Sequence, residues 1–209
     1  MGCNLRCIHC QNWSISQWYE QGDVYSPEEL ASIIDAARRR GCRNQNWVGG
    51  DPIPYIPFWI KVLLYERENT PVFFNTNGYY SVEASWLLAG IVDIYKIDFK
   101  YGPGDCAQRI SDAPRYWDVV TRNLLDASRR GEVLIRVLVL PNHIDCCYKP
   151  IIKWIVENLG PYTRVNIMWQ YRPEYQAHKL PELRRRLTKE EMEETIKIAE
   201  EYGLKNYIT

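Results

Sequence analysis

Three cysteines near the start of the chain have the spacing of a metal-binding loop, because Cys3, Cys7 and Cys10 form the pattern C-x3-C-x2-C. Three thiolates on one short loop can bind three irons of a [4Fe–4S] cluster and leave the fourth iron without a protein ligand. An iron with an open position can bind a substrate or a second cofactor. The pattern therefore predicts an iron–sulfur site at which a further molecule binds.

A zinc site is the alternative interpretation of the same loop. Structural zinc takes four ligands in a tetrahedron, so these three cysteines would need a fourth partner. His9 could supply it only by folding back between two cysteines, and Cys42 is distant in the sequence.

The remaining cysteines are Cys42, Cys106 and the adjacent pair Cys146 and Cys147. An odd total of seven, with three in one loop, differs from the disulfide framework of a secreted protein. We expect residues 146 and 147 to lie in an extended segment, where their side chains point to opposite faces. We therefore interpret them as buried thiols and not as a second cluster, and no ligand spacing involves Cys42 or Cys106.

Composition excludes several classes of protein. The 209-residue chain has 26 lysines and arginines against 26 aspartates and glutamates. Zero net charge gives no general attraction to a polyanion, so we expect neither nucleic acid nor membrane as a partner. The best apolar stretch, residues 55–65, contains Lys61 and is too short to span a bilayer. The N-terminus lacks the apolar region of a signal peptide, and we expect a cytoplasmic protein.

Helix and strand signals alternate along nearly the whole chain and predict a single domain over residues 1–209. Repeated strand–helix units imply a parallel sheet with right-handed crossovers, with helices on both of its faces. Because an ordinary barrel has eight strands, we expect an α/β fold with an open partial (β/α) barrel of about five to six parallel strands. The predicted strands are 45–48, 71–76, 92–99, 133–140 and 165–169, and the predicted helices are 27–40, 56–68, 81–88, 115–130, 151–159 and 188–202.

Further motifs follow the cysteines in order: Gly49-Gly50-Asp51-Pro52, Asn75-Thr76-Asn77-Gly78 and Asp98-Phe99-Lys100. Together with the cysteine loop they resemble the radical S-adenosylmethionine (SAM) superfamily, in its pyruvate formate-lyase activating enzyme-like branch. Residues 137–147 and 170–175 resemble uncharacterised activating-enzyme homologues of that branch. The resemblance covers essentially all 209 residues.

The resemblance implies an oxidoreductase whose cofactors are a [4Fe–4S] cluster and SAM. In that family, SAM chelates the open iron, and one electron from the reduced cluster cleaves it to methionine and a 5′-deoxyadenosyl radical. The radical abstracts a hydrogen atom from a substrate, which in activating enzymes is a backbone glycine of a glycyl-radical protein. The implied partners are SAM, an electron donor such as flavodoxin or ferredoxin, and either a glycyl-radical protein or a small molecule as substrate.

The resemblance also implies which residues contact SAM. Gly49 and Gly50 would let the backbone approach the SAM amino group, and Lys100 would pair with the SAM carboxylate. Asp98 with Asn75 would hold the ribose or a monovalent cation, although activating enzymes have Asp at the position of Asn75. The full implied set is Gly49, Gly50, Asp51 in place of the usual Glu, Asn75, Asn77, Asp98, Lys100, Arg136 and His178.

Alternatives remain for several of these side chains. Asp98 and Lys100 lie two apart on a strand and therefore point to one face. Arg136, inside an apolar strand, needs an anionic partner if it is buried, and a SAM carboxylate or a structural Asp would serve equally. Trp169 stands where related sequences often have a polar residue, which suggests an altered substrate cavity.

The chain departs from the family at its start. Met1-Gly2 stands where the family has the end of a strand, so we expect the first barrel strand to be absent, through truncation or in a naturally minimal enzyme. A non-catalytic iron–sulfur or zinc-binding protein is the alternative function.

Overall fold

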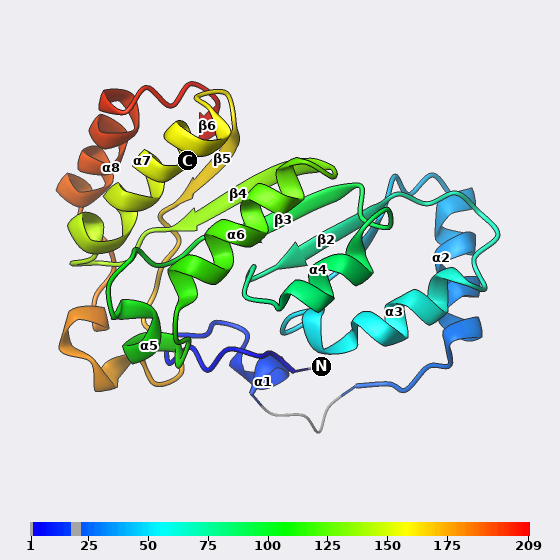
Figure 1. The fold of residues 1–209 in the computed structure, drawn as a ribbon. Coiled ribbons are helices and arrows are strands. Elements are labelled where there is room, and N and C mark those ends of the chain that lie inside the picture. The colour runs from blue at the N-terminus through cyan, green and yellow to red at the C-terminus, as the bar shows by residue number, and fades with distance from the viewer. Residues whose placement is uncertain (1, 18–21) are drawn as a thin grey trace.

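The structure is a computed structural model and describes residues 2–17 and 22–209 (Figure 1). Six strands form one parallel sheet in the order β1-β2-β3-β4-β5-β6. Among the described residues β1 and β6 do not pair, so the sheet is open, as the sequence predicts. The strands are β1 Gln45–Trp47, β2 Val72–Thr76, β3 Ile94–Asp98, β4 Glu132–Leu138, β5 Arg164–Met168 and β6 Tyr207–Ile208.

Helices fill the connections between the strands. The α-helices are α1 Trp13–Ser16, α2 Pro27–Arg39, α3 Ile56–Leu63, α4 Val82–Leu88, α5 Cys106–Ser111, α6 Tyr116–Ser128, α7 Lys149–Leu159 and α8 Lys189–Glu201. The short 3-10 helices are η1 Ile53–Tyr55, η3 Ala177–Lys179 and η4 Pro181–Leu183, and η2 Ile144–Tyr148 is a π-helix. Figure 1 shows α4, α6 and α7 in front of the sheet. No helix in the described ranges is long and apolar enough to cross a membrane.

The two faces of the sheet have different environments. One set of alternating side chains is fully buried in the hydrophobic core, with Trp47, Phe74, Ile97, Ile135 and Ile167 as members. The opposite set lines a cavity and includes Asn75, Asp98, Arg136, Leu138 and Met168. The prediction that helices cover both faces is therefore wrong, because the second face of β2 to β5 forms the wall of this cavity.

The segment around Cys146 and Cys147 corrects another prediction. These residues lie in η2, which continues directly into α7 at Lys149, so the segment is helical and not extended. Cys147 is buried as predicted, but the prediction of a buried thiol is wrong for Cys146, which is exposed. The patterns also did not predict α5 or β6, which are only six and two residues long. Such short elements carry too few residues for a periodicity to be recognised.

The close approach of the cysteine loop to the end of β1 depends on Gly50. A Cβ atom at this position would lie 2.3 Å from the carbonyl oxygen of Gly2 and 2.8 Å from the Cα of Ser16. At the neighbouring Gly49, a Cβ atom would meet nothing within 4 Å. The two adjacent glycines thus form a matched pair for a test of packing.

We expect Gly50→Ala to lower the free energy of unfolding by about 1–3 kcal/mol, because the new methyl group must displace backbone. Gly49→Ala should change it by less than about 0.5 kcal/mol. Denaturant unfolding of both variants measures the difference. Equal effects at the two positions would show that the loop does not pack on the end of β1 in this way.

Candidate functional site

The cysteine loop, residues 2–10, has no regular secondary structure, and distant elements hold its backbone in place. The N–H groups of Arg6 and Ile8 donate to carbonyl oxygens at the end of α5, at 2.9 and 3.0 Å. The carbonyl of Gly2 accepts from the N–H of Asp51 at 2.8 Å. The loop is therefore fixed from two sides, by α5 and by the segment that follows β1.

Each of the three cysteine sulfur atoms in the loop lies within hydrogen-bond distance of a donor. Hydrogen bonds to cysteine sulfur are one of the means by which a protein sets the reduction potential of an iron–sulfur cluster. The pairs are Ser111 Oγ to Cys7 Sγ at 2.9 Å, Cys10 Sγ with Ser16 Oγ at 3.1 Å, Leu5 N–H to Cys3 Sγ at 3.4 Å and Asn77 Nδ2 to Cys3 Sγ at 3.6 Å.

Burial keeps two of these thiols protonated when no metal is bound. Burial, with the nearby Asp51 carboxylate, raises the pKa of Cys3 to about 12. Burial also raises the pKa of Cys7 above its ordinary value. Since metals bind the thiolate, binding here releases protons, and the cation stabilises charge that the protein alone disfavours.

The spacing of the sulfur atoms suits a cluster better than a single ion. Ligands of one ion lie close together, whereas each cysteine of a [4Fe–4S] cluster binds a different iron. In residues 2–17 and 22–209, the ligand atoms of Cys3, Cys7 and Cys10 do not all lie within 4.8 Å of one another. The three side chains line one cavity, and this donor set fits three irons.

The alternative of zinc in this loop lacks its fourth ligand. His9 Nε2 lies 3.0 Å from the Tyr101 hydroxyl, and burial, aided by the positive charge of Lys100, lowers the pKa of His9 to about 4. Cys42 is exposed and lies outside the cavity lining. Neither residue is placed to complete a tetrahedron with the three cysteines.

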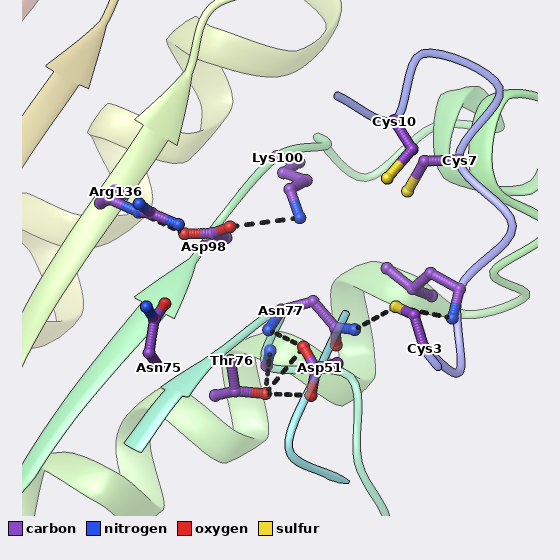
Figure 2. A network of polar contacts seen from close by, with 12 residues as sticks. Cys3, Cys7, Cys10, Asp51, Asn75, Thr76, Asn77, Asp98, Lys100 and Arg136 are labelled. Atoms are coloured by element: carbon purple, nitrogen blue, oxygen red, sulfur yellow. Dashed lines mark hydrogen bonds and ion pairs between the residues drawn. The ribbon is translucent and has the colours of Figure 1, made fainter. Parts of the chain in front are cut away.

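Asp98, Lys100 and Arg136 form a chain of charges in the cavity wall (Figure 2). Asp98 Oδ1 accepts from Arg136 Nε at 2.6 Å, and Lys100 Nζ lies 3.3 Å from Asp98 Oδ2. Burial opposes the charge on Asp98, but Lys100 and Arg136 outweigh it and hold the pKa of Asp98 below its ordinary value. Burial likewise disfavours the Lys100 ammonium, but the negative charge of Asp98 outweighs it and raises the pKa of Lys100. Asp98 and Lys100 therefore remain charged at neutral pH.

Asp51 connects the ends of β1 and β2. Its buried carboxylate accepts from the N–H of Asn77 at 2.7 Å, from Thr76 Oγ1 at 3.1 Å and from the N–H of Ile53 at 3.1 Å. Burial nevertheless raises the pKa of Asp51 to about 6. Asn77 in turn donates to Asn4 Oδ1 at 2.8 Å and to Cys3 Sγ at 3.6 Å, the second contact being drawn in Figure 2, so this network fixes the turn after β2 against the cysteine loop.

The cavity has a volume of about 270 Å³ and brings the predicted residues together. All three cysteines line it, and so do eight of the nine residues predicted to contact SAM: Gly49, Gly50, Asp51, Asn75, Asn77, Asp98, Lys100 and Arg136. Figure 2 shows Cys7 and Cys10 with their sulfur atoms directed toward the side of the cavity where Lys100 lies.

Two expected contributors lie elsewhere. His178 is exposed on η3, whose buried residue is Ala177, and it is not part of the cavity lining. Trp169 points away from the cavity, since its Nε1 donates to Thr195 Oγ1 on α8 at 3.0 Å. Met168 and Gln170, its neighbours in the chain, line the cavity instead. The structure therefore does not bring His178 or Trp169 into the lining of this cavity.

Sequence reasoning missed the polar residues that support Cys7. Ser111 Oγ lies 2.5 Å from the Tyr101 hydroxyl, which in turn lies 3.0 Å from His9 Nε2. This buried chain of hydrogen bonds ends on the Cys7 sulfur. Ser111 and Cys7 are 104 residues apart, and no local pattern marks the pair.

Comparisons with known proteins agree with this geometry. Residues 1–155 match the family described as the Radical SAM superfamily. An uncharacterized protein of Methanocaldococcus jannaschii, MJ0674, is 45% identical over an alignment that covers 97% of this chain and 61% of that protein. A second protein of the same organism, MJ0808, is 31% identical and is covered over 54% of its length. The chain thus spans only about half to three fifths of these curated relatives.

Solved structures are similar in fold. SuiB of Streptococcus suis bound to S-adenosylmethionine has a TM-score of 0.70 at 14% identity, over 100% of this chain and 48% of that one. A domain of pyruvate-formate lyase-activating enzyme from Bacteroides vulgatus has a TM-score of 0.58 at 17% identity, over 80% of this chain and 98% of that one. At these identities the similarity establishes the fold alone.

We expect Asp98→Asn to lower the free energy of unfolding by about 1.5–3 kcal/mol, because it leaves Lys100 and Arg136 as neighbouring, partly buried cations without an anion. The matched control is Asp118→Asn, which breaks the exposed ion pair with Arg115. The control should change stability by at most about 1 kcal/mol. Denaturant unfolding compares the two, and an effect at Asp98 no larger than at Asp118 would contradict the role of Asp98.

Proposed function

Because this chain belongs to the radical SAM superfamily, whose members use a [4Fe–4S] cluster and SAM, we propose that its cavity is the site of SAM cleavage. Cys3, Cys7 and Cys10 bind three irons of the cluster, and SAM binds at the fourth. The observation that carries the proposal is that the three thiols and the charges of Asp98, Lys100 and Arg136 line one cavity. One end of that cavity suits iron, and the other suits a polar, charged small molecule.

When bound, the cluster and SAM supply one-electron reductive cleavage of the sulfonium, which gives methionine and a 5′-deoxyadenosyl radical. The residues of this chain bind and orient the cluster and SAM. Lys100 offers three N–H donors from its ammonium group, one of them toward Asp98, and the others suit the SAM carboxylate. Gly49, with open space at its Cα, lets a ligand approach the backbone.

Other residues position these groups or exclude water. Asp98 holds Lys100 and Arg136 in place through its two oxygens. Asn75 Oδ1 accepts from Lys96 Nζ at 3.1 Å, which directs its amide N–H₂ group toward other partners and suits it to a ribose hydroxyl. Leu138 and Met168 supply the apolar wall that a radical reaction needs to limit side reactions.

The proposal extends to the substrate and the partners. We propose an activating-enzyme-like oxidoreductase that abstracts a hydrogen atom from a glycyl-radical protein, with flavodoxin or ferredoxin as electron donor. The motifs of residues 49–52, 75–78 and 98–100 support this branch. All seven cysteines are free thiols, which is consistent with the reducing cytoplasm.

The direct test is anaerobic reconstitution of the full chain, followed by reduction with SAM present. The proposal predicts about four irons and four sulfides per chain and the release of 5′-deoxyadenosine. A chain that binds zinc through the three loop cysteines and cleaves no SAM would instead be the non-catalytic metal protein.

Single Ala variants of Cys3, Cys7 and Cys10 should fold yet lose the brown cluster absorption and all SAM cleavage, because one iron loses its protein ligand. The exposed Cys42 provides the control, since Cys42→Ala should keep both the cluster absorption and SAM cleavage. Iron analysis and visible absorption measure the outcome. A full cluster in Cys7→Ala would overturn the ligand assignment.

Lys100→Met should weaken SAM binding about ten- to a hundred-fold and leave the iron content unchanged, since a charge-assisted hydrogen bond is worth about 1.5–3 kcal/mol. Calorimetric titration of the reconstituted protein with SAM measures the affinity. The exposed Lys153, which pairs with Glu157 on α7, serves as control through Lys153→Met. An unchanged affinity for SAM in Lys100→Met would mean that Lys100 pairs with Asp98 and does not bind SAM.

A further inference from the structure

Outside the cavity, a second group of metal-binding side chains gathers where α5 meets η2. Cys106 begins α5, and His143, Cys146 and Cys147 lie in or next to η2. In the described part of the chain, Cys106, His143 and Cys146 are the one group whose ligand atoms all lie within 4.8 Å of one another. None of these residues lines the cavity of the proposed SAM site.

The sulfur positions match the ligand shell of a single tetrahedral ion. In a tetrahedron with zinc–sulfur bonds of about 2.3 Å, neighbouring ligand atoms lie about 3.8 Å apart. The Cys106 and Cys146 sulfur atoms are 3.7 Å apart, and those of Cys146 and Cys147 are 3.8 Å apart. Cysteines that share a [4Fe–4S] cluster bind different irons, so this compact arrangement favours one mononuclear ion.

His143 is oriented as a metal ligand. Its Nδ1 lies 2.7 Å from the carbonyl oxygen of Pro141, so Nδ1 carries the proton and donates it in this bond. This leaves the lone pair on Nε2. Metal-binding histidines commonly donate the second ring N–H to a backbone carbonyl in this way, which fixes the ring and its tautomer.

The fold brings the two halves of the group together through an unusual close contact. A Cβ atom at Gly102, just before α5, would lie 2.0 Å from the carbonyl oxygen of Cys146. Only glycine allows the loop after β3 to pack this closely on η2. The wide π turn keeps the sulfur atoms of both adjacent cysteines on the side of Cys106, which an extended segment would not do.

We propose that Cys106, His143 and Cys146 bind one Zn²⁺ ion, and that the Cys147 side chain, which lies outside the 4.8 Å group but 3.8 Å from the Cys146 sulfur, turns in as the fourth ligand. Three thiolates with one imidazole form a closed structural zinc site. The Arg109 guanidinium lies near the Cys106 sulfur and offsets part of the negative charge of the thiolates.

The position of this site gives the ion a structural role. α5 runs from Cys106, a ligand of this ion, to Ser111, which donates to Cys7 in the cysteine loop. An ion that holds the first residue of α5 against η2 therefore steadies the helix on which the cluster loop rests. The site itself does not depend on the proposed SAM chemistry.

Anaerobic titration of the metal-free full chain with Co²⁺ tests the proposal, because tetrahedral thiolate-bound Co²⁺ has intense visible bands that Zn²⁺ removes by displacement. The background protein carries Cys3→Ser, Cys7→Ser and Cys10→Ser, so that the cluster loop cannot bind. We expect one Co²⁺ per chain in this background. Adding Cys106→Ser or Cys146→Ser should abolish the bands, and adding Cys42→Ser should leave them unchanged.

A second measurement leaves the residues of the zinc site unchanged, so its result does not depend on whether the variants fold. Zn²⁺ should protect the exposed Cys146 from alkylation, detected by peptide mass spectrometry, whereas the exposed Cys42 stays reactive. Absence of Co²⁺ bands, bands that survive Cys106→Ser, or a disulfide among the cysteines of the zinc site in the reduced protein would each overturn the proposal. Zinc here with no SAM cleavage would contradict only the proposed function, and SAM cleavage without this zinc would contradict only the present inference.

Discussion

The structure depends on how an irregular loop satisfies its backbone polar groups. Residues 2–10 form no helix or strand, and a buried N–H or carbonyl without a partner is costly. Their partners therefore come from other elements: the end of α5 accepts from Arg6 and Ile8, and the N–H of Asp51 donates to Gly2. The hydrogen bonds that satisfy the backbone polar groups of the loop also hold three thiols at one end of the sheet.

Several features follow from this docking. Gly50 lacks a side chain because the loop lies against its Cα, and Asp51 is buried because the ends of β1 and β2 must be joined beneath the loop. On the opposite wall, Asp98 pairs with both Lys100 and Arg136 and offsets one of their two positive charges. Burying these charges costs desolvation energy, but it provides fixed polar groups before any ligand binds.

The sequence patterns predicted the strands, the sheet and those side-chain directions that follow from local periodicity. Alternation along β3 placed Asp98 and Lys100 on one side, and they form an ion pair there. Strand–helix order predicted the open parallel sheet. Gly49, Gly50, Asn75 and Asn77 line the cavity because the carboxyl ends of parallel strands meet at one edge of a sheet.

The remaining features depend on tertiary contacts or on rare local geometry. Ser111 and Cys7 are 104 residues apart in the sequence, so no local sequence pattern predicts their contact. The prediction that Cys146 and Cys147 point apart assumed a strand, whereas a π-helix occupies the segment. Such turns are rare, and no simple periodicity marks them. His178 lies in the loop region after β5, where the position of a side chain depends on how the loop packs.

The proposed function requires that SAM bind directly to an iron that has no protein ligand. Electron paramagnetic resonance of the reduced, reconstituted protein tests it with SAM labelled with ¹⁵N in its amino group. The account predicts that SAM changes the cluster spectrum and that the label shows hyperfine coupling to the cluster. A spectrum unaffected by saturating SAM, with no coupling to the labelled nitrogen, would contradict it.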